Sequence, residues 1–114
     1  MFEYTSINQY QLALTQGKGS CVEAVRHYLN QIEKSKHLNA FVQVFAEEAI
    51  QKASALDEKR TSGNTIGKLH GVVIAIKDVI CYKDHPLTAA SGILKKFTSL
   101  YSATAIEKLL QEEA

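Results

Sequence analysis

The sequence has no long apolar run; its longest comprises only the residues from Val72 to Ile76. A membrane-spanning helix needs about 20 consecutive apolar residues, so the sequence predicts no membrane span. The first residues, Met1 to Tyr4, also lack the basic segment and apolar core of a secretory signal. These absences predict a cytoplasmic protein that does not enter a membrane.

Charge of one sign is not in excess either, and cysteine is scarce. Thirteen lysines and arginines against twelve acidic residues leave a net charge of +1, whereas an autonomous nucleic-acid binder normally carries a basic surplus. The two cysteines, Cys21 and Cys81, could form one disulfide at most, and reduced thiols are expected in a cytoplasmic protein. With 46% apolar and 22% charged residues among 114, the composition is that of one folded domain.

The first third of the chain predicts helices. One helix is expected over residues 6–16, where apolar residues recur at helical spacing. A second helix is expected over residues 21–35, because Ser20 and Glu23 have the spacing of a capping box at its start. Residues 1–37 are therefore predicted to form a helical lead-in.

The rest of the chain predicts strands alternating with helices. Residues 38–45 are rich in β-branched and aromatic side chains, which is typical of a strand, and a helix is expected over residues 46–60. The apolar run within residues 71–78 predicts a strand covered on both faces, as in α/β sheets. Thr104 and Glu107 have the spacing of a second capping box and predict a last helix.

This order predicts the start of an α/β core over residues 38–114, within a single domain that spans residues 1–114. A βαβ arrangement needs a strand after its helix, and the sequence has none after the last predicted helix. We therefore expect the chain to be a portion of a longer enzyme.

Lys77 is the one candidate catalytic residue. It follows the apolar run directly, and in open α/β sheets ligand sites lie beyond the carboxyl ends of strands. A lysine amine shielded from water gives up its proton more easily and can then act as a base. From position alone, however, a lysine that ends a strand is more often a solvated or ion-paired terminus.

Several motifs around Lys77 occur together in one order. The segment from Gly71 to Asp78 has a glycine, an apolar strand and then Lys-Asp. Upstream stands Leu38-Asn39-Ala40-Phe41, and downstream stand Thr88-Ala89-Ala90-Ser91, Leu94, Phe97 and Tyr101-Ser102-Ala103-Thr104. Together these motifs closely resemble the amidase-signature family, and within it the A subunits of glutamyl-tRNA and aspartyl-tRNA amidotransferases. The resemblance covers roughly the whole chain, and the order of several motifs makes it specific.

The resemblance implies an α/β fold, of which this chain would be the N-terminal, incomplete portion: a mixed sheet flanked by helices. It also implies a Ser–cis-Ser–Lys catalytic unit, in which the lysine takes a proton from the cis serine, which in turn activates the nucleophilic serine. Lys77 matches that lysine, the general base and charge relay. Both serines belong to a glycine- and serine-rich stretch of the family that does not occur here. Ser91 and Ser102 match other parts of the motif.

The function implied by the resemblance is hydrolysis of glutamine, with the ammonia passed on to convert glutamate mischarged on tRNA(Gln) to glutamine during protein biosynthesis. The implied partners are the B and C subunits of a heterotrimer, which bring the mischarged tRNA. ATP and Mg²⁺ would be used by a partner subunit, and this chain would bind no cofactor or metal. Lacking both serines, the chain alone is expected to be inactive. Two alternatives stay open: another amidase-signature hydrolase of small or fatty amides, and a catalytically dead interaction module.

The chain departs from the family pattern at two positions. Val73 stands where the family often has proline, so the strand gains a backbone donor. Val79 stands where it often has asparagine, so a polar side chain near Lys77 is lost. Asp78 is expected to anchor the following turn or to orient the lysine, and we favour the first role.

The other candidate sites have less support. Cys81 and His85 are four residues apart, but no second pair of ligands is spaced to complete a metal site, and nothing further supports a Cys–His catalytic pair. Gly17-Lys18 and Gly67-Lys68 lack the glycine-rich loop of a phosphate site.

Overall fold

Helices make up most of the regular structure in the computed structural model, which describes residues 2–114. The α-helices of these residues are α1 (Ile7–Thr15), α2 (Cys21–Lys34), α3 (Ala46–Thr61) and α4 (Thr104–Gln111). Two short 3-10 helices are η1 (Lys36–Leu38) and η2 (Gly92–Leu94). The first three predicted helices are confirmed to within two residues at each end. No helix of the described residues has the length and apolarity needed to cross a membrane.

Local capping explains where the first helices begin. The Ser6 hydroxyl accepts the amide of Gln9 at 3.2 Å and starts α1. The Ser20 hydroxyl accepts the amide of Glu23 at 3.0 Å and starts α2, as the capping box predicts. The second predicted capping box, with Thr104 as the cap of α4, is wrong. The cap is the preceding residue, Ala103, which makes no side-chain capping bond.

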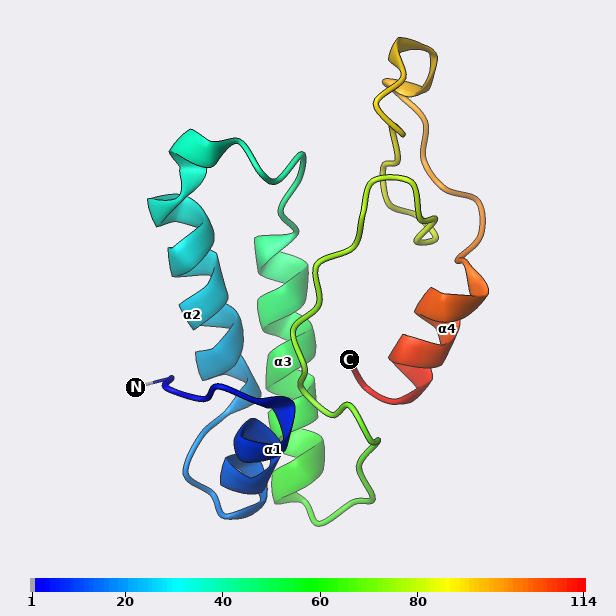
Figure 1. Cartoon of the computed structure of the whole chain (residues 1–114). Coiled ribbons are helices and arrows are strands. Elements are labelled where there is room, and N and C mark those ends of the chain that lie inside the picture. Colours follow the sequence, from blue (N-terminus) through cyan, green and yellow to red (C-terminus); the bar gives the residue numbers. More distant parts are fainter. Residues whose placement is uncertain (1) are drawn as a thin grey trace.

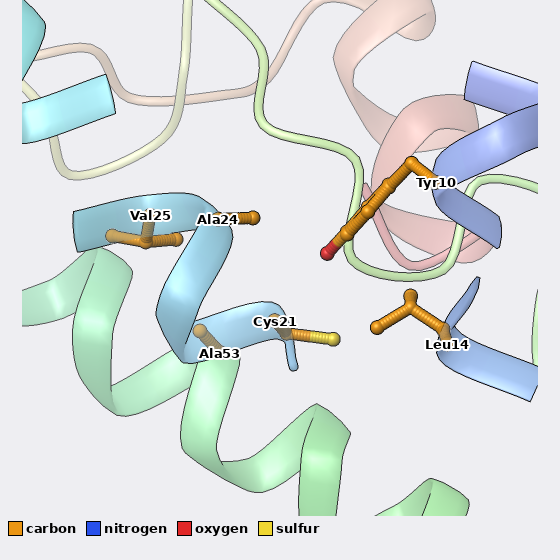
Figure 2. Packing of buried hydrophobic residues seen from close by; sticks show 6 residues of the cluster. All are labelled: Tyr10, Leu14, Cys21, Ala24, Val25 and Ala53. Carbon is orange, nitrogen blue, oxygen red and sulfur yellow. The ribbon is translucent and has the colours of Figure 1, made fainter. Parts of the chain in front are cut away.

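The core lies where α1, α2 and α3 meet (Figure 1). Its buried members are Tyr10, Leu14, Cys21, Ala24, Val25 and Ala53. The side chains of Leu14 and Cys21 point toward each other across the junction of α1 and α2 (Figure 2). Ala24 of α2 and Ala53 of α3 are both buried in this core, and such small residues let neighbouring helices approach closely. The result is a helical hairpin of α2 and α3 with α1 packed across one end.

Neither predicted strand forms within residues 2–114. Leu38 closes η1, and Asn39 follows it with a φ of +50° in the left-handed region. Residues 40–45 then join α2 to α3 without pairing to a strand. Residues 72–76 are equally free of ladder pairing. A run of β-branched residues favours extended backbone, but a strand also needs a partner for its amides and carbonyls. The described residues supply none, so the predicted mixed sheet is absent from them.

The irregular stretch between residues 80 and 104 forms an arm that projects beyond α4 (yellow to orange in Figure 1). Its two sides are joined by an antiparallel bridge between Pro86 and Thr98. Backbone bonds from Leu87 to Phe97 (3.2 Å) and from Ser99 to His85 (2.9 Å) support the bridge. The arm carries several of the motif residues that follow Lys77.

Candidate active site

Gly71 fixes the start of the segment that leads to Lys77. Its amide donates to the carbonyl of Glu113 at 2.9 Å, and its carbonyl accepts the buried Tyr10 hydroxyl at 3.0 Å. Its φ is +73°, and a Cβ at this position would lie 2.5 Å from the sulfur of Cys21. Only glycine meets both conditions, since other residues avoid this backbone region and would collide with the core.

From Gly71 the chain runs along an apolar cavity of about 270 Å³. The cavity is lined by residues of α2, α3 and α4, by residues 41, 43–45 and 71–76, and by Tyr82 and His85 of the arm. The sequence predicted that the apolar run would be covered on both faces. Instead Val73, Ile74 and Ile76 each keep about 40% of their surface exposed. Within the described residues this run has no second layer to bury it.

Lys77 ends the extended segment with an exposed side chain. Its carbonyl accepts the amide of Ile80 at 3.0 Å, which closes a tight turn directly after it. No hydrogen bond or ion pair reaches its amine within residues 2–114, so the amine is free to meet groups from elsewhere. A lysine that acts as a base also needs shielding from water, and this part of the chain does not supply it.

Asp78, the next residue, is tied to the arm. One carboxylate oxygen accepts the amide of Thr88 at 2.9 Å, and the other accepts the Thr88 hydroxyl in a short bond. The Asp78 carbonyl accepts the amide of Ala89 at 2.9 Å. The bonds from the Thr88 hydroxyl and amide lower the pKa of Asp78 below its ordinary value. Asp78 thus anchors a turn, but one that starts ten residues further along the chain and not the turn that directly follows it.

The two serines of the motif structure the arm. The Ser91 amide donates to the carbonyl of Thr88 at 2.8 Å and closes a turn. The Ser102 hydroxyl accepts the amide of Lys83 at 3.0 Å and links the two ends of the arm. Both serines therefore take part in the hydrogen bonding of the arm.

Both ring nitrogens of His85 contact groups other than Cys81. Its Nε2 lies 2.8 Å from a carboxylate oxygen of Glu48, and its Nδ1 lies 2.7 Å from the carbonyl of Lys83. Its ring stacks on Tyr82 with centroids 3.9 Å apart. With both ring nitrogens engaged, His85 has none left to activate the free thiol of Cys81.

A cluster around Glu113 was not predicted from the sequence. The carboxylate of Glu113 accepts the amide of Gly67 at 2.9 Å and pairs with Lys59 and with the buried His70. Desolvation raises the pKa of Glu113, but the bonds from Lys59, Gly67 and His70 outweigh it and lower the pKa to about 2. Lys59 and His70 lie 54 and 43 residues away along the chain, and no local pattern joins them.

Comparisons with known proteins show which family the chain resembles in sequence and fold. The family model described as Amidase matches residues 23–114. A solved bacterial aryl acylamidase of the amidase-signature enzymes superimposes with a TM-score of 0.87 at 27% identity, covering 97% of this chain and 24% of that one. A solved protein of a vestigial complex, related to the origins of an s-triazine catabolic enzyme, gives a TM-score of 0.89 at 21% identity over 96% of this chain and 24% of that one.

The chain therefore belongs to the amidase-signature family. Among named relatives, it is 42% identical over 111 residues to the A subunit of glutamyl-tRNA(Gln) amidotransferase from Chlorobium chlorochromatii, covering 97% of this chain and 23% of the relative. The corresponding protein of Thermobifida fusca is 44% identical over 98 residues, which are 85% of this chain and 20% of the relative. The chain spans less than a quarter of the length of these relatives.

Proposed function

We propose that this chain is the N-terminal segment of the glutamine-hydrolysing A subunit of an amidotransferase, and that Lys77 is its general base. The observation that carries the proposal is the identity of about 40% to such subunits across nearly the whole chain. The place of Lys77 in the matched Lys-Asp motif, directly after the apolar segment that starts at Gly71, supports the catalytic assignment.

In the proposed reaction, the neutral Lys77 amine takes a proton from the cis serine, which takes one from the nucleophilic serine. The serine oxygen then attacks the side-chain amide carbon of glutamine, and the C–N bond breaks as the nitrogen gains a proton and leaves as ammonia. Water completes the cycle by releasing glutamate. Both serines, and the strands that complete the mixed sheet around Val72–Ile76, come from chain beyond this segment.

The proposed setting is a complex with the B and C subunits. The partner subunit would use ATP and Mg²⁺ to activate the mischarged tRNA, and the ammonia would reach it from the site at Lys77. The names of the relatives support a role as one component of an amidotransferase. A hydrolase of other amides is the second candidate, favoured by the aryl acylamidase fold; its identity of 27% is well below that of the A subunits.

A graft tests the proposal. In the graft, residues 1–114 of this chain replace the matching segment of the Chlorobium chlorochromatii relative, which is produced with the other subunits of that amidotransferase. We expect the graft to release ammonia from glutamine. The chain of 114 residues alone should release none above the buffer blank. An inactive graft, or ammonia released by the chain alone, contradicts the proposal.

A further inference from the structure

Two neighbouring alanines on the arm have an unusual backbone conformation. Ala89 has a φ of +47° and Ala90 a φ of +55°. They are the central residues of a turn closed by the bond from the Ser91 amide to the Thr88 carbonyl. Turns with both central residues at positive φ favour asparagine and glycine. In alanine the Cβ crowds the following carbonyl oxygen, so this turn does not form by local preference.

Asp78 supplies the restraint that the turn lacks. Its carboxylate accepts both the amide and the hydroxyl of Thr88, the first residue of the turn. Its carbonyl accepts the amide of Ala89, the second residue. One residue thus holds the first half of the turn by its side chain and its backbone, and we call these bonds the Asp78 clamp.

The clamp acts on the residue next to the proposed base. Lys77 precedes Asp78, and the Lys77 carbonyl is itself fixed by the amide of Ile80. The backbone at Lys77 and the strained turn are therefore joined as one unit. Strained backbone that is held by its surroundings is concentrated at active sites, where it positions reacting groups.

We propose that Asp78 is a positioning residue for the reaction of Lys77, holding the Thr88–Ser91 turn as a wall of the site beside the lysine. The inference rests on the proposed function and deepens it. It predicts that loss of the clamp slows the chemical step while substrate binding changes little, because the clamp fixes the backbone beside the lysine.

The first test is Asp78→Ala in the graft. We expect kcat for ammonia release to fall on the order of 10- to 100-fold, as small misplacements of reacting groups do, with KM changed by less than about threefold. Asp84→Asn is the control, since it removes one charge from an exposed residue of the same arm. Its kcat should stay within about twofold of the unmodified graft.

The second test restores the turn without the clamp. Asn-Gly favours a turn with positive φ at both central residues, so A89N and A90G should let the turn form unaided. The triple variant D78A/A89N/A90G should regain most of the kcat lost in D78A. A residue that contributed to the chemistry directly would not be rescued in this way.

The outcomes separate the inference from the proposed function. A graft without activity defeats the proposed function and this inference with it. An active graft in which D78A keeps its kcat, or in which the triple variant stays as slow as D78A, overturns the inference alone. If D78A does not fold, Thr88→Val removes only the hydroxyl bond. Its kcat should then fall below that of Thr88→Ser, which keeps the hydroxyl, and equal values overturn the inference.

Discussion

The carboxylate of Asp57 accepts the backbone amide of Cys21 at 2.9 Å, so a side chain of α3 caps the first turn of α2. Its other oxygen accepts the amide of Val22 at 3.1 Å. The same carboxylate pairs with Arg60 at 3.0 Å, and the Arg60 guanidinium also donates to the carbonyl of Leu14 near the end of α1. Two residues of α3 thus connect all three helices of the core.

Replacement of Asp57 by alanine should destabilise the helical part of the chain. The variant loses two capping bonds and leaves the mostly buried Arg60 without its carboxylate, so the free energy of unfolding should fall by about 2–4 kcal/mol. Urea unfolding followed by circular dichroism measures the change. Glu58→Ala, at the exposed neighbouring position, is the control. Equal stability of the two variants would refute the capping role of Asp57.

Acid should weaken the attachment of the chain's last residues to the core. The pKa of Glu113 is lowered to about 2 from its ordinary 4.5, so its ionised form is favoured by folding. A lowered pKa means that this stabilisation is complete above pH 4.5 and is lost as the pH falls toward 2. We expect Glu113→Gln to flatten the fall of the unfolding midpoint over this window. If the unfolding midpoint of Glu113→Gln falls with pH as steeply as that of the unmodified chain, the Glu113 cluster does not stabilise the fold.

The chain of 114 residues should self-associate in isolation. Its extended segment keeps unpaired backbone groups and exposed apolar side chains beside an apolar cavity, and such edges pair readily with other chains. Size-exclusion chromatography with light scattering should show species larger than a monomer that grow with concentration. Ile74→Lys, in the segment, should shift the chain toward monomer. Ile93→Lys, on the arm and away from the cavity, should not.

A different result would place the association elsewhere. If Ile93→Lys shifts the chain toward monomer and Ile74→Lys does not, the chains associate through the arm and not through the extended segment. A sharp monomer peak for the unmodified chain would show that the described residues bury enough surface by themselves.

The sequence predicted the helices well because their signals are local. Ser20 and the apolar spacing after it act within one or two turns, and α2 follows from them directly. The strands could not be predicted in the same way. The pattern at Val72–Ile76 indicates extended backbone, but whether a ladder forms depends on partner strands that residues 2–114 do not contain.

The site was predicted in part for the same reason. Lys77 and Asp78 are adjacent, so the Lys-Asp motif marks them together. The bonds that Thr88 donates to the Asp78 carboxylate join residues ten apart, and alanines at positions 89 and 90 do not indicate a turn with positive φ. The Glu113 cluster joins residues still farther apart. Contacts of this kind depend on the folded backbone, and single-sequence patterns do not encode them.

The role of Lys77 is tested most directly by Lys77→Ala in the graft. The account predicts that kcat for ammonia release falls on the order of 10³-fold or more, as loss of a triad member does, while KM for glutamine changes little. Lys95→Ala, at an exposed lysine on the arm, is the matched control and should keep its kcat. A Lys77→Ala graft that keeps about a tenth or more of the unmodified turnover would contradict the assignment of Lys77 as the general base.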